Sequence, residues 1–165
     1  MIELLLLDVD GTLTDGKLHY LPTGEEFKTF DVQDGMGLSY WLKLGKKVAI
    51  ISGRFSQSTL SRARDLGIMD CFLGIEDKRQ KALEIMQKYN LQPQQVACVG
   101  DDINDIAMFE VCGLRFAPLN AQEVLKQYAD IFLKRSGGNG AVREAIDYII
   151  HKDGLEGKIL ELFKK

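Results

Sequence analysis

The stretch IELLLLDVDGTLT, residues 2–14, joins the apolar run Ile2–Leu7 directly to acidic and small polar residues. Such runs are typical of parallel strands that are buried on both faces of a sheet. The sequence therefore predicts a parallel sheet to which residues 2–7 contribute the first strand. Four further runs, each bounded on at least one side by Gly, Asp or Ser, predict its other strands: Val48–Ile51, Val96–Val99, Leu114–Ala117 and Ile131–Leu133.

Segments with helical spacing of apolar residues lie between these runs. Alternation of strand and helix implies right-handed crossovers between neighbouring parallel strands. We therefore expect an α/β fold, a doubly wound, Rossmann-like parallel sheet flanked by helices. The expected helices are Met36–Leu44, Ser56–Leu66, Asp77–Tyr89, Ile103–Val111, Glu123–Tyr128 and Ala141–Ile150.

One segment departs from this alternation. Lys17–Tyr20 and Glu26–Phe30 are typical of two short strands, and the five residues Leu21–Glu25 between them include Pro22 and Gly24. This pattern predicts a small β-hairpin, about residues 17–30, inserted after the first strand. The end of the sequence, about residues 153–165, is expected to form an amphipathic tail.

Length and charge set limits on the function. A chain of 165 residues fits one domain that buries roughly 70% of the surface of its unfolded form. We therefore expect residues 1–165 to form a single domain. Acidic residues outnumber basic ones by 24 to 21, and no dense stripe of Lys and Arg is present. Nucleic acid is therefore not an expected partner.

The cysteines and the first residues of the sequence indicate the cellular compartment in which we expect the protein. Cys71, Cys98 and Cys112 are odd in number, widely spaced and set among apolar residues, which favours buried thiols in a reducing environment. The run Ile2–Leu7 is too short for a signal peptide core or a membrane span. We therefore expect a cytoplasmic protein without a membrane segment.

Polar residues follow the predicted strands at the edge where open α/β sheets bind ligands. Asp8 and Asp10 follow the first strand, and Ser52-Gly53-Arg54 follows the second. Lys78 begins a predicted helix, and Gly100-Asp101-Asp102-Ile103-Asn104-Asp105 follows the strand Val96–Val99. Crowded carboxylates favour a hard cation, while a hydroxyl next to glycine can approach an anion. Together these residues predict a cation site beside a phosphate site.

Each of these features has a structural explanation when it stands alone. Asp8 and Asp10 are compatible with a polar turn, and the acids in 101–105 with the capping of a helix. A Ser-Gly turn and a surface lysine such as Lys78 are common. The order in which these four groups of residues, three after strands and one at a helix start, follow one another along the chain favours function.

These motifs resemble those of the haloacid dehalogenase superfamily of phosphohydrolases. The resemblance implies that Asp8 is the nucleophile and forms a phosphoaspartyl intermediate, while Asp10 protonates the leaving group and then activates water. It implies Mg²⁺ as the cofactor, held by Asp8, the main-chain carbonyl of Asp10 and Asp101. Asp102 and Asp105 are expected to orient Lys78 and the waters on the metal.

The same resemblance implies a site for the phosphoryl oxygens, formed by Ser52, the amide of Gly53 and Lys78. Arg54 and Arg143 are candidates for binding a substrate carboxylate, because the planar guanidinium suits two-point contact with such a group. Surface ion pairs are the alternative for both arginines.

A closer resemblance concerns the substrate. The hairpin, Asp34-Gly35 and residues 137–144 are similar to those of capless phosphatases that act on 3-deoxy-D-manno-octulosonate 8-phosphate (KDO 8-phosphate) in lipopolysaccharide precursor synthesis. These enzymes are homotetramers that associate through their hairpins, so a tetramer is expected. We hypothesise that the tail from Leu155 reaches a neighbour's active site.

Three alternatives remain open at this stage. Asn104 is similar to the residue in phosphatases of nonulosonate phosphates, so another 2-keto-3-deoxy sugar acid phosphate is an alternative substrate. A catalytically silent binding subunit on the same fold is a second alternative. A phosphotransferase that excludes water is the third, although the absence of a large cap disfavours it.

Overall fold

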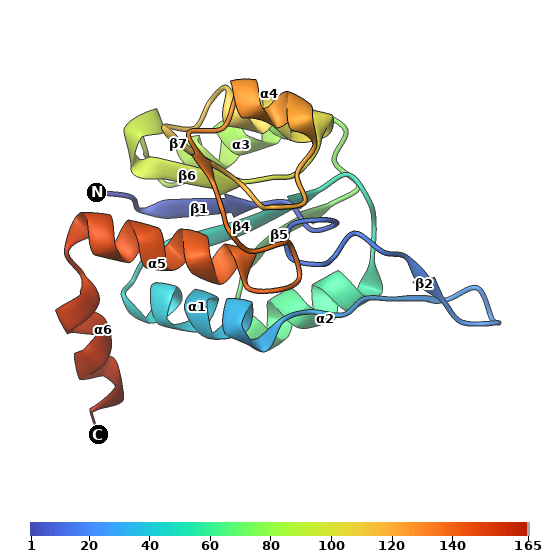
Figure 1. Cartoon of the computed structure of the whole chain (residues 1–165), viewed down its shortest axis with the longest axis horizontal. Coiled ribbons are helices and arrows are strands. Elements are labelled where there is room, and N and C mark those ends of the chain that lie inside the picture. Colours follow the sequence, from blue (N-terminus) through green and yellow to red (C-terminus); the bar gives the residue numbers. More distant parts are fainter. Residues whose placement is uncertain (165) are drawn as a thin grey trace.

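The computed structural model describes residues 1–164 and places a parallel sheet of six strands at the centre of the protein (Figure 1). The expected doubly wound α/β fold is confirmed. The strand order is β5-β4-β1-β6-β7-β8, so β1 lies inside the sheet. The strands are β1 Leu4–Leu7, β4 Lys47–Ser52, β5 Asp70–Leu73, β6 Val96–Val99, β7 Leu114–Ala117 and β8 Ile131–Phe132.

Strand β5 is absent from the sequence prediction. It reads Asp-Cys-Phe-Leu, and three of its four residues are only half-buried. It lies at one edge of the sheet, next to β4 alone. An edge strand does not need the continuous apolar run that buried parallel strands show, and this explains why the pattern missed it.

Helices cover both faces of the sheet (Figure 1). Alternate residues of β1 divide between two hydrophobic clusters, with Leu5 and Leu7 in one and Leu4 and Leu6 in the other. The first cluster includes residues of α1 Val32–Lys43, α2 Gln57–Leu66 and α5 Ala141–Asp153. The second includes residues of α3 Lys78–Lys88 and α4 Ile106–Phe109.

Side-chain caps set the starts of three helices. Asp31, Ser56 and Asp77 precede α1, α2 and α3, and each accepts hydrogen bonds from backbone amides of the first turn. The cap at Asp31 starts α1 four residues earlier than the apolar spacing predicts, at Val32 rather than Met36. The cap at Asp77 places Lys78 in the first position of α3.

Two expected helices are shorter and tighter than the pattern predicts. Residues 103–109 form the 3-10 helix η2 Ile103–Asp105 and the single turn α4, and residues 123–127 form the 3-10 helix η3 Glu123–Gln127. A further 3-10 helix, η1, covers Pro93–Gln95. Segments of this length make few α-helical bonds, and tighter turns then compete well.

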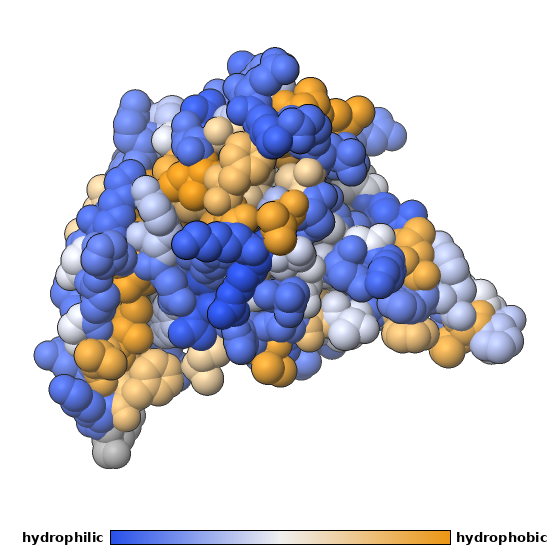
Figure 2. Space-filling view, viewed as in Figure 1, coloured by the Kyte–Doolittle hydropathy of each residue, from blue (hydrophilic) through white to orange (hydrophobic). Residues whose placement is uncertain are grey.

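The predicted hairpin is present, with β2 His19–Tyr20 and β3 Glu26–Phe27 in antiparallel register. The ladder is shorter than residues 17–30. The hairpin projects from the body of the protein and carries hydrophobic residues among hydrophilic ones (Figures 1 and 2). Its apolar side chains are largely exposed, and Phe55 is exposed as well: Leu18, Tyr20, Leu21 and Phe27.

The tail forms α6, Glu156–Phe163, at the opposite end of the molecule from the hairpin (Figure 1). Ile159 and Leu162 pack against the first hydrophobic cluster. The amide of Ile2 donates to Asp153 (2.9 Å), so the tail starts near the amino end of β1. The hypothesis that it reaches a neighbour's site stays a prediction. None of the helices formed by residues 1–164 is long and apolar enough to cross a membrane.

Candidate active site

The carboxyl ends of β1, β4 and β6 bring the predicted site residues to one edge of the sheet. Leu7 lies in register with Ile50 of β4 and Val99 of β6, so the residues that follow each strand emerge together. The order of the strands reverses beside β1, where doubly wound sheets bind ligands. A pocket of about 160 Å³ opens there, lined by Asp8, Asp10, Ser52, Gly53, Arg54, Asp101, Asp102 and Asn104.

Three carboxylates and one ammonium group cluster beside this pocket, and two of the carboxylates, Asp8 and Asp101, line it. Oxygens of Asp8, Asp101 and Asp105 all lie within 4.8 Å of one another. The ammonium of Lys78, 2% exposed, donates to Asp8 Oδ1 (2.6 Å) and to Asp105 Oδ1 (2.7 Å). One positive charge therefore contacts two of the three clustered carboxylates, in a site largely closed to water.

Two of the carboxylates that line the pocket, Asp8 and Asp101, have raised pKa values. Burial, opposed by Lys78, raises the pKa of Asp8 to about 6. Burial, with added repulsion from Asp8 and Asp105, raises the pKa of Asp101 to about 8. The single ammonium of Lys78 therefore does not offset the burial and mutual repulsion of these acids.

These residues fit a divalent cation. The donors are all oxygens, as Mg²⁺ prefers, and a cation would offset the repulsion that the raised pKa values express. Asp105 is already engaged, because its Oδ2 accepts the amides of Asp101 (2.8 Å) and Asp102 (3.2 Å). Asp8 and Asp101 therefore offer free oxygens toward the pocket, while Asp105 holds Lys78.

Mg²⁺ is expected to stabilise the fold more at pH 8 than at pH 5.5. The folded state holds protons on Asp8 and Asp101 that the unfolded chain releases near 3.8, so the metal-free protein loses stability as the pH rises from about 4 to about 8. Mg²⁺ at 100 times its Kd adds about 2.7 kcal/mol, or roughly 5–10 °C in Tm. At pH 5.5 protons compete for the same oxygens.

Thermal unfolding with and without Mg²⁺, at constant ionic strength, measures this difference at each pH. Asp101→Asn is the matched control, because it keeps the shape of the side chain and removes the charge. Its Tm is expected to respond little to Mg²⁺ at either pH. An equal rise of Tm for the wild type at both pH values would contradict the prediction.

Ser52 and Gly53, which the sequence predicts to bind phosphate, also line this pocket. The side chain of Ser52 is buried at the end of β4, and its Oγ accepts the amide of Arg54 (3.3 Å). A Cβ at Gly53 would meet only the carbonyl of Ile75, at 3.7 Å, so the backbone here is open to close approach. Ser52 and Gly53 therefore lie across the pocket from Asp101, with Asp8 between β4 and β6.

The structure distinguishes Asp102 from Asp105, and it places Arg143 away from the pocket. Asp102 lines the pocket but caps η2, since its side chain accepts the amide of Ile103 (2.7 Å), and Asp105 is the acid that contacts Lys78. The structure does not bring Arg143 to the pocket. Its Nε pairs with Asp147 (2.9 Å) and its guanidinium lies over the ring of Tyr40, the surface alternative considered for this residue.

Arg54 does reach the pocket, and its guanidinium is engaged by the hairpin. Nη2 contacts Glu26 Oε2 (2.5 Å), and Nε lies 3.7 Å from Asp10 Oδ2. A substrate carboxylate would therefore compete with Glu26 for this arginine.

Sequence reasoning gave no role to Lys28, Thr12 or Asn120. Lys28 forms an ion pair with Asp10, and Thr12 donates to Asp101 Oδ1 (3.2 Å). Alternation along β3 places residues 26 and 28 on the same face, a signal that could have paired Glu26 with Lys28. No local pattern marks Asn120, which follows β7.

Asn120 ties two loops beside the pocket. Its amide donates to the carbonyl of Gly11 (2.8 Å) and its Oδ1 accepts the amide of Gly137 (2.6 Å). Residues 137–140 form a tight bend, with positive φ at Gly138 and Gly140. A Cβ on Gly137 would lie 1.9 Å from the carbonyl oxygen of Gly11.

Gly137→Ala is therefore expected to destabilise the protein by about 1–3 kcal/mol, because two backbone segments must separate to admit one methyl group. The displaced loop carries Asp10 and Gly11, so we expect catalysis to fall as well. Urea denaturation and steady-state kinetics measure the two effects. Gly157→Ala, where an added Cβ meets nothing within 4 Å, is the control: it should leave catalysis unchanged and should not lower stability, because alanine suits helix α6 better than glycine.

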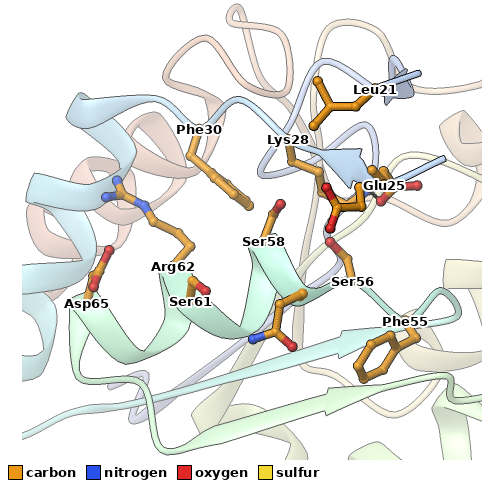
Figure 3. Close-up of a pocket in the computed structure, with 12 residues that line it drawn as sticks. Leu21, Glu25, Lys28, Phe30, Phe55, Ser56, Ser58, Ser61, Arg62 and Asp65 are labelled. Carbon is orange, nitrogen blue, oxygen red and sulfur yellow. Dashed lines mark ion pairs between the residues drawn. The ribbon is translucent and has the colours of Figure 1, made fainter. Parts of the chain in front are cut away.

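A larger hollow of about 660 Å³ lies between the hairpin and α2 (Figure 3). Ser58, Ser61 and Arg62 border it from α2, while Lys28 and Glu25 border it from the hairpin side (Figure 3). None of the three clustered carboxylates lines it. The chemistry therefore belongs to the smaller pocket at the sheet edge.

Comparisons with known proteins agree with this site. A family model described as haloacid dehalogenase-like hydrolase matches residues 67–146. The 3-deoxy-D-manno-octulosonate 8-phosphate phosphatase KdsC of Haemophilus influenzae is 39% identical over 153 residues, which cover 93% of this chain and 85% of that protein. The Escherichia coli K12 protein of the same name is also 39% identical, over 93% of this chain and 81% of that one.

Solved structures agree as well. The cobalt-bound Haemophilus influenzae phosphatase has a TM-score of 0.89 at 39% identity, covering 93% of this chain and 90% of that one. The Moraxella catarrhalis 3-deoxy-D-manno-octulosonate 8-phosphate phosphatase, in complex with magnesium, phosphate and KDO, has a TM-score of 0.92 at 34% identity. It covers 98% of this chain and 93% of that one.

The fold and the acidic pocket define a haloacid dehalogenase-like hydrolase. Within that class the relatives share one name and match nearly the whole chain. The chain belongs to the family of 3-deoxy-D-manno-octulosonate 8-phosphate phosphatases, KdsC.

Proposed function

We propose that this protein is a Mg²⁺-dependent phosphatase, formed by residues 1–165 as one hydrolase domain, that hydrolyses KDO 8-phosphate to KDO and phosphate in lipopolysaccharide precursor synthesis. One observation carries the proposal: Asp8 and Asp101 face one pocket with Ser52, and Lys78 lies beneath Asp8. The family's shared name and the magnesium, phosphate and KDO in a relative's structure support it.

Asp8 is the proposed nucleophile. Its Oδ1 is held by Lys78 (2.6 Å), so the carboxylate has a defined direction at the end of β1. Attack on phosphorus forms the Asp8 acyl phosphate and releases the sugar alcohol, and water then hydrolyses that intermediate. Lys78 also lowers the pKa of Asp8 against the effect of burial, which favours the ionised nucleophile.

Asp10 is the proposed general acid and base. It lines the same pocket two residues after Asp8, where it protonates the departing alkoxide and later takes a proton from water. Ser52, the amide of Gly53 and Lys78 are the proposed donors to the phosphoryl oxygens. Donors fixed in advance stabilise the charge that spreads over these oxygens.

Asp8, the main-chain carbonyl of Asp10 and Asp101 are the proposed holders of Mg²⁺. When bound, the ion supplies positive charge that reduces repulsion between the nucleophile and a dianionic ester. Thr12 supports Asp101 through a hydrogen bond, and Asp105 supports Lys78. For Arg54 we propose contact with the substrate carboxylate. The position of Arg143 favours ion pairing with Asp147 instead.

We also propose a homotetramer that associates through the hairpins, in the cytoplasm. The exposed apolar side chains of the hairpin support the first part, because such groups gain from burial against another chain. The free thiols of Cys71, Cys98 and Cys112 favour a reducing compartment.

Phosphate release across a panel of esters tests the substrate. Asn104 lines the pocket and favours a nonulosonate 9-phosphate as the second candidate, so the panel includes this ester, KDO 8-phosphate and simple sugar phosphates, each with Mg²⁺ or EDTA. We expect the highest kcat/KM with KDO 8-phosphate, and no release in EDTA. A higher value for the nonulosonate ester would assign the second substrate, and no Mg²⁺-dependent release from any ester would refute the proposal.

A further inference from the structure

The carboxylate of Asp10 is held by a residue of the hairpin. Lys28, directly after β3, forms an ion pair with Asp10 Oδ1, and its ammonium also lies 3.0 Å from Glu26 Oε1. The side chain of Lys28 is 1% exposed and that of Asp10 is 20% exposed. Burying an ammonium group is costly without a partner, so the position of Lys28 depends on these two acids.

Arg54 also lies beside both acids, on the Oδ2 side of Asp10. It contacts Glu26 Oε2 (2.5 Å) and lies 3.7 Å from Asp10 Oδ2. The acidic side chains of Asp10 and Glu26 thus alternate with the cationic side chains of Lys28 and Arg54. The formal charges of these four groups sum to zero. Each oxygen of Asp10 faces one cation, Lys28 from the hairpin and Arg54 from the loop after β4.

Asp10 lies beyond the end of β1, where no strand pairing holds its side chain. A general acid must come within about 2.6–3.2 Å of the oxygen that it protonates. A displacement of about 1 Å can cost on the order of 100-fold in rate. The buried ammonium of Lys28, paired with Oδ1, restricts the movement of the Asp10 carboxylate.

We propose that Lys28 is a positioning residue for Asp10, so that the hairpin supplies part of the proton-transfer geometry of the active site. The inference rests on the proposed role of Asp10 as general acid. The competing explanation is that Lys28 only anchors the hairpin, through Glu26, and has no influence on proton transfer.

Leaving groups of different basicity separate these explanations. An alkoxide such as that released from KDO 8-phosphate needs a proton as it departs, whereas p-nitrophenolate needs almost none. The value of kcat/KM reports the steps up to formation of the Asp8 acyl phosphate, and therefore excludes the later hydrolysis by water. A misplaced Asp10 should reduce kcat/KM for the alkyl ester and spare the aryl ester.

For Lys28→Met we expect kcat/KM to fall about 10–100-fold with KDO 8-phosphate and less than about threefold with p-nitrophenyl phosphate. Asp10→Asn should show the same selectivity with a larger loss. Lys28→Arg should restore part of the activity on the alkyl ester. Lys17→Met is the control on the same segment, because Lys17 is 75% exposed and contacts Asp15 (3.7 Å), and should leave both values unchanged.

Glu26→Gln tests the competing explanation directly. It removes the anchoring acid and leaves the pair between Lys28 and Asp10, so we expect a smaller loss on the alkyl ester than Lys28→Met causes. Equal losses for the two variants, or a uniform loss on both esters in a folded Lys28→Met protein, would overturn the inference. Should Lys28→Met not fold, Lys28→Gln keeps a polar side chain and carries the same expectation.

The wild type separates this inference from the proposed function. Wild-type protein that is inactive on both esters would overturn the proposed function and the inference with it. Active wild type combined with a uniform loss in the Lys28 variants overturns the inference alone.

Discussion

Asp8→Asn is expected to reduce phosphate release by at least about 10⁴-fold, because the amide cannot attack phosphorus and no neighbouring group replaces it in line. The substitution keeps the shape of the side chain and removes one of three crowded carboxylates. The metal-free variant should therefore be at least as stable as the wild type at pH 8, where the raised pKa of Asp8 makes its ionised form costly.

Steady-state phosphate release with Mg²⁺ and a Tm without it measure the two parts of this prediction. Asp15→Asn is the matched control, since Asp15 lies in the same loop but its side chain is 47% exposed and pairs with Lys17. The control should keep wild-type turnover. Residual turnover of Asp8→Asn within tenfold of the wild type would exclude Asp8 as nucleophile.

Lys78→Met is expected to cost about 3–5 kcal/mol of unfolding free energy at neutral pH without Mg²⁺, because it leaves two buried carboxylates facing each other without their cation. Lys78 contacts both Asp8 and Asp105 and is almost fully buried, so water cannot replace it. The loss should shrink toward pH 5, because burial raises the pKa of Asp8 to about 6 and protons then neutralise this acid. Turnover should fall too, since Lys78 is a proposed donor to the phosphoryl group.

Urea denaturation at pH 7.5 and pH 5 measures the loss of stability. Lys81→Met is the control on the same helix, because Lys81 pairs with Glu84 at the surface and such pairs contribute little. The double variant Lys78→Met/Asp105→Asn should recover part of the lost stability, since one of the stranded charges is removed. Strict additivity of the two single changes would contradict the coupling.

Much of the fold follows from local pattern. Parallel strands that are buried on both faces must be apolar throughout, so runs such as Leu4–Leu7 and Val96–Val99 are visible without structural information. The apolar pattern misses the edge strand β5 because most of its residues are only half-buried. Helix α1 starts earlier than the pattern predicts because Asp31 caps it. Local chemistry decides these ends more than periodicity does.

The assembly of the pocket also follows from the sequence, for a geometric reason. Residues after parallel strands meet at one edge, so Asp8, Ser52 and Asp101 were predicted together and the structure brings them together. Their catalytic roles stay predictions until the variants are measured. The same rule does not apply to Lys78, because this residue is the first of helix α3 and does not directly follow a strand.

What the sequence determined by itself was the set of acids and polar residues that meet at one edge of the sheet, because strand ends and side-chain chemistry are local properties. The tertiary structure alone decided which charges pair: Asp105 rather than Asp102 with Lys78, Asp147 with Arg143, and the hairpin's Lys28 with Asp10. Such pairs depend on the directions of side chains from segments far apart in the chain. Those directions exist only after the hairpin and the helices have packed against the sheet.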